Sequence, residues 1–341
     1  MIPKLYLPAD WTIRLPLSVA GRSDTAVGLL VSLNLTQPRE MKPRDIAAYA
    51  FLAVTWGLSF LVLLKVVHAF GWVGAVTLRS LIAGITLFLL AAATRRRLDF
   101  SAGWRHFATV GATTVAAQLI GLSYATPRIG TAMAAILVAA IPLFSMILGQ
   151  LWGLERITVR GLAGLLLGAA GIVVLVGFPS VPITPSFAFG CAASLFSSFS
   201  AAFGSNYANR HLRSAGSFEL TGAAFLFGGL MTLPLLLAVP VPAMPRPVDF
   251  LYLVLLACVM SAVTYVVYFR LVASIGATRT ISVEFAVTTI AVLVGTIMLG
   301  ESLTIIQAFG AVAIIGGCIL VLDPFPRRAK AAALPSAPPL V

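Results

Sequence analysis

Apolar runs of about 20 residues, separated by short polar breaks, fill most of the chain. A helix of about 20 apolar residues crosses the roughly 30 Å hydrocarbon core of a bilayer. A membrane barrel would instead show alternating apolar and polar residues, so the pattern predicts an all-α integral membrane protein. The breaks define ten candidate transmembrane helices, at residues 46–66, 72–93, 105–125, 130–151, 159–178, 185–207, 218–239, 250–273, 277–299 and 304–322.

One stretch of this pattern occurs twice, at residues 129–177 and 275–323. Each copy contains an apolar run, a polar break with a Glu, and a second apolar run with spaced glycines. A copy of this kind predicts an internal structural repeat. With a displacement of 146 positions and no gap, eight pairs coincide: Ile129/Ile275, Gly130/Gly276, Ala140/Ala286, Gly149/Gly295, Glu155/Glu301, Thr158/Thr304, Gly164/Gly310 and Gly171/Gly317.

Charge predicts the orientation of the spans. Only 10% of the 341 residues are charged, against about 25% in soluble proteins, yet the formal net charge is +12. With a cytoplasmic N-terminus, 19 of the 23 Lys and Arg residues fall on the cytoplasmic side, and only Arg128 and Arg246 fall outside. Because Lys and Arg collect in cytoplasmic loops, this bias predicts a multi-pass protein of the cell membrane with both termini in the cytoplasm. No basic soluble domain for nucleic-acid binding is present.

Ten spans divide into two halves of five, at residues 44–178 and 185–323. Because five is odd, the second half must enter the membrane in the opposite orientation. The copied Glu155 then falls on a cytoplasmic loop and Glu301 on an external loop. The sequence therefore predicts two inverted five-helix repeats, an architecture of many secondary transporters with a site between the halves.

The two ends of the chain differ from the spans. Residues 1–40 mix prolines and charges with one apolar patch, at residues 27–33, that is too short to cross a membrane. We expect a disordered N-terminal tail there and a cytoplasmic tail at residues 324–341.

Three sequence motifs resemble a known family of transporters. They are Trp56-Gly57-Leu58-Ser59-Phe60, Arg79-Ser80-Leu81-Ile82-Ala83 and Leu299-Gly300-Glu301-Ser302-Leu303-Thr304. Together they resemble the EamA-type family of the drug/metabolite transporter superfamily, over residues 44–323. The resemblance implies a ten-helix carrier that moves small metabolites, amino acids or drugs, often outward.

The family's usual proline before the repeated Glu is present as Pro142, but Thr288 replaces it in the second half. We therefore expect a kink in the fourth span and a straighter ninth span.

Two charged residues lie deep within predicted spans. Arg79 and Glu284 each sit about seven residues into a span, roughly 10 Å from the membrane edge. An ionised side chain at that depth is expected to face a cavity or a partner. For Glu284 the hypotheses are proton coupling, binding of a cationic substrate group, or an ion pair with Arg270 or Arg279. For Arg79 they are contact with an anionic substrate group, a structural ion pair, or hydrogen bonds to neighbouring backbone.

Four further residues complete the predicted substrate-binding set. Trp56 belongs to the first motif, Gln118 is a polar residue of the third span, and Ser197 and Ser198 lie on the unusually polar sixth span. Hydroxyl groups can also bond the backbone of helices, so helix packing is the alternative for the two serines.

The repeated Glu and glycines also have structural interpretations. Thr304 is expected to cap the helix that follows it, with Glu301 complementing the positive end of that helix. Glycines at spacings of three and four in the fifth span, and a sparser set in the tenth span, predict close helix packing.

The sequence lacks the residue patterns of catalytic or metal sites. The three histidines are not spaced as metal ligands, and no Ser-His-Asp set or nucleotide-binding loop occurs, so we predict no catalytic residue, metal or cofactor. The predicted function is secondary transport of a small metabolite, amino acid or drug by alternating access, in the direction of export. The alternatives are a channel or a polytopic membrane enzyme. The expected partners are a small-molecule substrate and the lipid bilayer, with proton coupling and a homodimer as further hypotheses.

Overall fold

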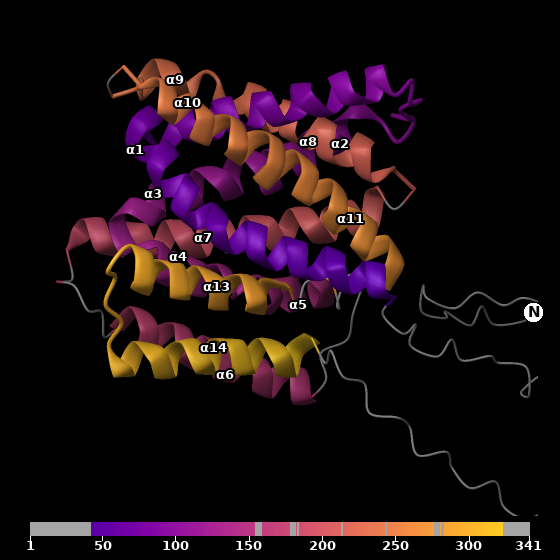
Figure 1. The fold of residues 1–341 in the computed structure, drawn as a ribbon. Coiled ribbons are helices and arrows are strands. Elements are labelled where there is room, and N and C mark those ends of the chain that lie inside the picture. The colour runs from indigo at the N-terminus through magenta and orange to yellow at the C-terminus, as the bar shows by residue number, and fades with distance from the viewer. Residues whose placement is uncertain are drawn as a thin grey trace, which may run out of the picture.

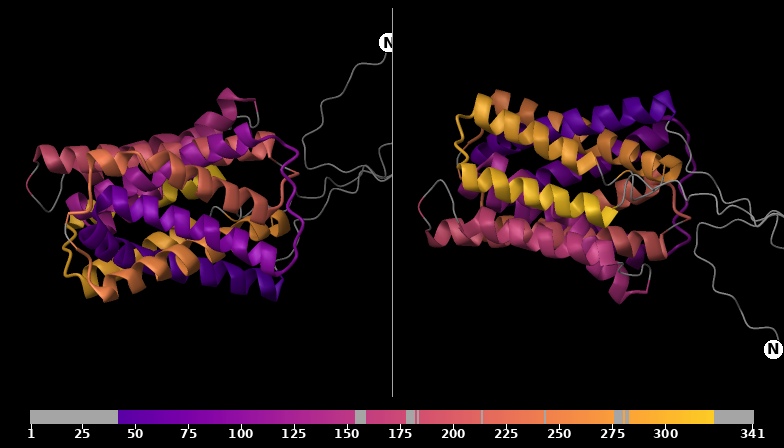
Figure 2. Two further views of the ribbon diagram at one scale, coloured as in Figure 1. Left: turned by 90° about the horizontal axis from the view of Figure 1, so that it is seen from above. Right: turned by 90° about the horizontal axis from the view of Figure 1, so that it is seen from below.

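The computed structural model describes residues 42–153, 159–177, 182, 184–212, 214–242, 244–275, 280 and 283–322. Every regular element in these ranges is a helix (Figure 1), and the long helices run along one common direction (Figure 2). In the described ranges six helices are long and apolar enough to cross a membrane, and three shorter apolar helices accompany them. An all-α membrane fold is therefore confirmed, while the tails at residues 1–40 and 324–341 lie outside the described residues.

The chain forms its helices in this order: α1 (Pro43–Ala93), α2 (Trp104–Val110), η1 (Gly111–Ala117), α3 (Gln118–Ile129), α4 (Thr131–Val138), α5 (Ile141–Leu151), α6 (Val159–Gly177), α7 (Pro185–His211), α8 (Ser217–Thr232), α9 (Leu235–Ala238), α10 (Pro247–Val254), η2 (Leu255–Val263), α11 (Thr264–Ile275), α13 (Val283–Met298) and α14 (Ile305–Leu322).

A single glycine separates the first two predicted spans. They form one helical run, α1, that changes direction at Gly71, whose φ of 73° and ψ of 166° are not helical. Positive φ is readily available only to glycine, which has no β-carbon. A β-carbon there would also lie 3.2 Å from Cδ of Pro242, so both conformation and space require glycine.

The fourth predicted span is broken just before its proline. Helix α4 ends at Val138 and α5 begins at Ile141, which places Pro142 in the first turn of α5. Proline cannot donate a backbone hydrogen bond within a helix, and it is tolerated in the first turn, where no such bond is needed. Helix α13, which carries Thr288 at the corresponding position, runs unbroken from Val283 to Met298. Both expectations about Pro142 and Thr288 are confirmed.

Two π-helical segments were not predicted from the sequence. η1 lies between α2 and α3, and η2 lies between α10 and α11. Displaced by the 146 positions of the sequence repeat, η1 falls on residues 257–263, which lie inside η2. The two halves therefore have π-helical backbone at corresponding positions. Such π segments occur frequently at functional sites.

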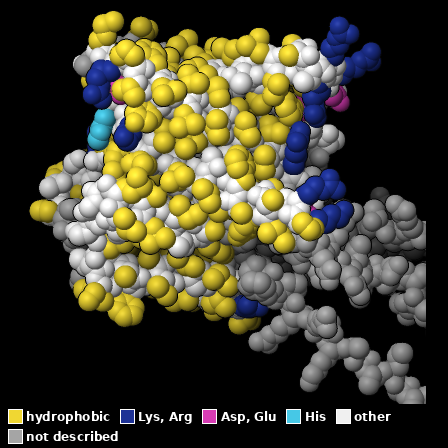
Figure 3. Space-filling view, viewed as in Figure 1, with side chains coloured by type: hydrophobic (Ala, Val, Ile, Leu, Met, Phe, Trp, Pro, Cys, Tyr) yellow, Lys and Arg dark blue, Asp and Glu magenta, His cyan; other side chains and the backbone are white. Residues whose placement is uncertain are grey.

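Lys and Arg side chains gather at one end of the bundle, on the right of Figure 3. We call this the arginine-rich end; it includes the end of α1, the start of α2 and the end of α7 (Figure 1), near which lie Arg95, Arg96, Arg97, Arg105 and Arg210. At this end Arg96 forms an ion pair with Glu219 near the start of α8, with its Nε 3.9 Å from a carboxylate oxygen. We call the other end of the bundle, which holds Arg128 and Arg246, the opposite end.

Helices α6 and α14 lie side by side at the edge of the bundle and pack through glycines (Figure 1). A β-carbon on Gly171 would lie 2.7 Å from the carbonyl oxygen of Gly310, and one on Gly317 would lie 2.5 Å from the carbonyl oxygen of Gly164. Side chains cannot fit at these distances, so the two backbones touch directly. Close packing through these glycines, predicted from their spacing, is confirmed.

Two neighbouring glycines of α14 allow a matched test of this packing. We expect Gly317→Val to lower the free energy of unfolding by about 1–3 kcal/mol or more, because the added side chain overlaps the backbone of α6. Gly316→Val is the control, since a β-carbon there meets only Cδ2 of Leu167, at 3.7 Å. Thermal unfolding of the purified protein in detergent measures both. Equal melting temperatures for the two variants would refute the packing account.

Candidate substrate cavity

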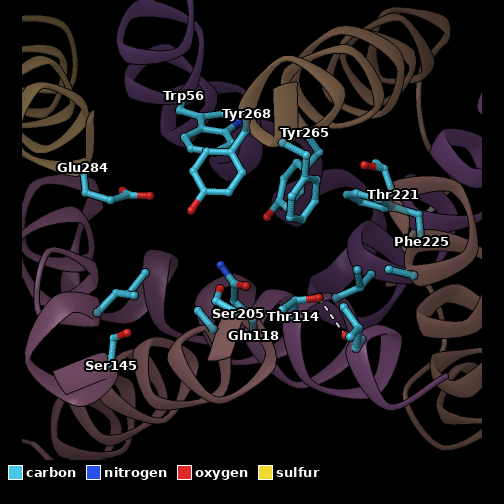
Figure 4. Close-up of a pocket in the computed structure, with 16 residues that line it drawn as sticks. Trp56, Thr114, Gln118, Ser145, Ser205, Thr221, Phe225, Tyr265, Tyr268 and Glu284 are labelled. Atoms are coloured by element: carbon cyan, nitrogen blue, oxygen red, sulfur yellow. Dashed lines mark hydrogen bonds between the residues drawn. The ribbon is translucent and has the colours of Figure 1, made fainter. Parts of the chain in front are cut away.

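A cavity inside the bundle is lined by both halves of the chain (Figure 4). It lies nearer the arginine-rich end, because Glu284 is the second residue of α13, and Thr221 and Ser205 lie close to the ends of α8 and α7 at that side. The first half contributes Trp56, Thr114, Gln118 and Ser145 among others, and the second half contributes Ser205, Thr221, Phe225, Tyr265, Tyr268 and Glu284.

Three aromatic rings form one wall of this cavity. The ring of Trp56 lies 5.5 Å from that of Tyr265 and 5.4 Å from that of Tyr268, measured between centroids. The indole Nε1 of Trp56 donates a hydrogen bond of 2.9 Å to Oγ1 of Thr264, which fixes the orientation of the indole. Phe225 supports Tyr265 from the side at 5.1 Å, edge to face. The hydroxyl groups of both tyrosines point into the cavity in Figure 4.

Polar side chains occupy the wall that faces these rings. The amide of Gln118 points into the cavity, with Ser205 beside it. Within the described residues, neither side chain has a hydrogen-bond partner in the protein, whereas Ser145 accepts a bond of 2.9 Å from the amide of Asn206. Thr114 is also occupied, since its hydroxyl donates to the carbonyl of Val110 at 2.7 Å. Gln118 and Ser205 therefore remain available to a ligand.

Glu284 extends its carboxylate into the cavity (Figure 4). Among the described residues it has neither a hydrogen-bond donor nor an ion-pair partner. Arg270, one of the partners considered from the sequence, instead lies over the ring of Phe218, 5.9 Å from its centroid. The other, Arg279, lies outside the described residues. The expected ion pair with Arg270 is thus absent, and the carboxylate faces open space.

Arg79 lies beside the cavity and does not line it. Its side chain is only 5% exposed, and Nε donates a hydrogen bond of 2.6 Å to Oγ of Ser261, within η2. Ser261 in turn donates to the carbonyl of Leu256 at 2.7 Å, a carbonyl within the π segment. Tyr265, one turn further along, carries one ring of the aromatic wall. The buried cation is therefore anchored behind the aromatic wall.

Ser197 and Ser198 are directed away from the cavity. The hydroxyl of Ser197 donates to the carbonyl of Gln118 at 2.8 Å, and that of Ser198 donates to the carbonyl of Leu137 at 3.0 Å. Both serines are buried, so their hydroxyls join α7 to α3 and α4. This geometry matches the packing alternative. Of the sixth-span serines, Ser205 is the one that lines the cavity.

Of the six residues predicted to bind the substrate, three line the cavity, and Arg79, Ser197 and Ser198 do not. Trp56, Gln118 and Glu284 meet at the cavity, and their role as ligands of a substrate stays a prediction. Tyr268 was missed, although its spacing of three residues from Tyr265 places both rings on one face of a helix.

At the opposite end, Glu301 caps a helix of the other half. Its Oε1 accepts hydrogen bonds from the backbone N–H and the hydroxyl of Thr131, at 2.7 and 2.9 Å. Its Oε2 accepts from the N–H of Ala132, at 2.8 Å. A carboxylate at this position complements the positive end of α4 and satisfies N–H groups that lack partners within the helix. The expectation that Glu301 serves the helix after it is therefore wrong. Thr304 does cap that helix, accepting from the N–H of Gln307 at 3.1 Å.

Two glycines make room for this carboxylate. Gly130, with φ of 83°, precedes α4, and a β-carbon there would lie 3.2 Å from the Glu301 carboxyl carbon. A β-carbon on Gly295 would lie 2.6 Å from Oε2 of Glu301. Gly130, Gly295 and Glu301, which each belong to a matched pair of the sequence repeat, thus meet in one contact between the halves. The corresponding Glu155 lies outside the described residues.

A membrane-spanning helical bundle with an interior cavity lined from both halves defines a polytopic membrane protein of the transport type. The model of the EamA-like transporter family matches residues 45–177 and, a second time, residues 188–323. Because these two matches cover most of the chain, the protein belongs to the EamA-like transporter family, which confirms the resemblance seen in its motifs.

Several curated proteins are similar to this chain. Protein PecM of Dickeya dadantii is 28% identical over 295 residues, which cover 85% of this chain and 96% of PecM. The uncharacterized inner membrane transporter YedA of Escherichia coli K12 is 26% identical, over 83% of this chain and 92% of YedA. An uncharacterized transporter of Archaeoglobus fulgidus is 24% identical, over 80% of this chain and 96% of that protein. One protein of known crystal structure has the same fold, with a TM-score of 0.59 and 16% identity, over 82% of this chain and 96% of that one.

Removal of the Glu301 carboxylate tests the contact between the halves. We expect Glu301→Ala to lower the free energy of unfolding by about 1–3 kcal/mol, because two backbone N–H groups at the start of α4 lose their acceptor. Glu301→Gln keeps one acceptor oxygen and should cost less. Asp99→Asn, in an exposed loop, is the control. Thermal unfolding in detergent ranks the variants, and an Ala variant as stable as the Asp99 control would contradict the cap.

Proposed function

We propose that this protein is a secondary transporter with ten transmembrane helices in two inverted halves, residues 44–178 and 185–323. It moves a small molecule across the membrane by alternating access, in the direction of export. The observation that carries the proposal is the cavity between the halves, into which Glu284 directs a carboxylate without an ionic partner among the described residues. In transporters built from inverted repeats, the substrate site lies between the two repeats.

The helices support ten spans. The turn at Gly71 divides α1 into two segments, each long enough to be a span. The five other long helices and the three shorter apolar helices of the described ranges supply the remaining segments. The double match of the family model, at residues 45–177 and 188–323, supports the division into two halves.

Asymmetry between the two ends supports alternating access. At the opposite end, the contact of Glu301 with Thr131 and Ala132 joins the halves. The cavity lies nearer the arginine-rich end, and the excess of Lys and Arg there favours a cytoplasmic position for that end. This conformation would load a cytoplasmic solute, in keeping with export. For release on the other side, the Glu301 contact must open.

Glu284 is the group that we assign to energy coupling. A carboxylate that faces a cavity can exchange its proton with the solvent of whichever side the cavity reaches. Binding of a proton and of a substrate at one carboxylate would then exclude each other, which couples export of the substrate to entry of a proton. A transporter of this kind needs no nucleotide.

The orientation is tested by labelling two exposed loop positions with a membrane-impermeant thiol reagent. Ser101→Cys lies at the arginine-rich end and Met244→Cys at the opposite end, in a background without Cys191, Cys258 and Cys318. In intact cells we expect labelling of Met244→Cys alone, because the arginine-rich end faces the cytoplasm. Ser101→Cys should react once the cells are permeabilised. Labelling of Ser101→Cys in intact cells would overturn the proposed orientation.

The coupling role of Glu284 is tested in proteoliposomes with an imposed pH gradient. The solute is one that raises the melting temperature of the purified protein, because a ligand that binds the folded state stabilises it. We expect Glu284→Gln to lose all dependence of uptake on the gradient, since the titratable group is removed, while exchange of solute for solute continues. Asp99→Asn should behave as wild type. Equal gradient dependence in wild type and Glu284→Gln would rule out this role.

A further inference from the structure

Among the described residues that line it, the cavity has a single acidic side chain, Glu284, and no basic one. Of its 16 lining residues, Glu284 is the only Asp, Glu, Lys, Arg or His. Among the described residues, two cations on neighbouring elements are directed elsewhere: Arg79 donates its Nε to Ser261, and Arg270 lies over Phe218. An anion in this cavity would be repelled by the ionised form of Glu284 and would meet no cation among the described lining residues. The charge of the site therefore favours a positively charged ligand.

The aromatic wall lies next to this carboxylate. Tyr268 lines the same cavity, with the carboxylate of Glu284 directed toward it, and Trp56 and Tyr265 continue the wall away from Glu284 (Figure 4). Aromatic rings attract cations by the negative potential of their faces, and the attraction is strongest for Trp and when the site excludes water. An ammonium group can thus pair with the carboxylate while it contacts aromatic rings.

The remainder of the cavity suits a flat apolar body. Val115, Ile141 and Phe225 give it apolar surface, and the rings of Trp56 and Tyr265 offer faces and edges for stacking. Opposite them, Gln118 and Ser205 have free hydrogen-bonding groups. These can bind a ring nitrogen or hydroxyl.

A metal ion does not fit this site as well as an organic cation. In the described part of the chain, no group of three or more His, Cys, Asp or Glu side chains is arranged to hold a metal. Divalent cations such as Mg²⁺ and Ca²⁺ need several oxygen ligands, whereas an ammonium group needs one carboxylate and a few weak contacts.

We propose that the substrate class is a small organic cation, a protonated amine or quaternary ammonium attached to a flat apolar body, whose positive group pairs with Glu284 beside Tyr268. This assignment rests on the proposed transport function, because it names the solute that the carrier moves. It is nevertheless tested by binding alone.

The test compares ligands that differ only in charge. Tryptamine, tryptophol and indole-3-acetate share one ring system and carry an ammonium, a hydroxyl and a carboxylate; phenethylamine, 2-phenylethanol and phenylacetate form a second series. Titration calorimetry of the purified protein in detergent gives the affinities. In at least one series we expect the amine to bind about tenfold tighter than the alcohol, the change expected for one charge-assisted hydrogen bond, and the acid to bind no better than the alcohol. No preference for the amine in either series would overturn the proposal.

Three variants separate the contributions. Glu284→Gln should remove the preference for the amine, and Asp99→Asn should leave it unchanged. Tyr268→Leu, which removes the ring, should weaken amine binding, whereas Tyr268→Phe, which keeps the ring, should bind the amine about as well as wild type. Circular dichroism and melting curves verify that each variant is folded. An amine preference that survives in Glu284→Gln would refute the assignment.

The result is distinguishable from failure of the transport proposal. If the purified protein binds amines through Glu284 but proteoliposomes show no solute exchange, the transport function fails and the cation site stands. If proteoliposomes exchange an anionic or neutral solute and neither amine binds, the substrate class fails and the transport function stands.

Discussion

The contact on which the arrangement of the two halves depends is the carboxylate of Glu301 at the start of α4. The first N–H groups of a helix have no partner within it, and at a membrane edge packed with apolar side chains few acceptors are available. The acceptor comes from the other half of the chain, 170 residues away in sequence. It brings α13 against α4, and Thr288 continues the contact by donating to the carbonyl of Ala135 at 3.3 Å. These bonds, together with the packing of α13 on α1, hold the helix that carries Glu284 at the cavity.

Polar side chains in the bundle fall into two groups with different consequences. Ser197, Ser198 and Thr288 give their hydrogen bonds to carbonyls of neighbouring helices, and so hold helices together without offering anything to a ligand. Gln118, Ser205 and Glu284 keep their polar groups directed into the cavity. An unused polar group costs stability in an apolar interior, so its retention at a cavity points to binding.

Local patterns in the sequence were enough to predict the helices, the break at Pro142 and the presence of Glu284 in the interior, because each depends on residues within one span. The direction in which a side chain points was harder to predict. Ser197 and Ser205 lie on the same helix, and only the positions of α3 and α5 decide which of them meets a neighbour and which meets space. The partner of Glu301 and the two π segments depend on contacts between distant parts of the chain, which a single sequence does not record.

The matched positions of η1 and η2 bear on the history of the molecule. The hydrogen bonds of a π turn run from residue i to i+5, so the turn holds one residue more than an α turn, as an insertion would produce. Two separate insertions would have no reason to fall at the same place in both halves, whereas a single insertion in an ancestral five-helix gene, followed by duplication of that gene, would leave both. In the present molecule η2 holds the anchor of Arg79 and η1 carries Thr114 at the cavity, so the two segments have different tasks. The asymmetry of the present site would then have arisen by divergence after duplication, on a backbone that was already in place.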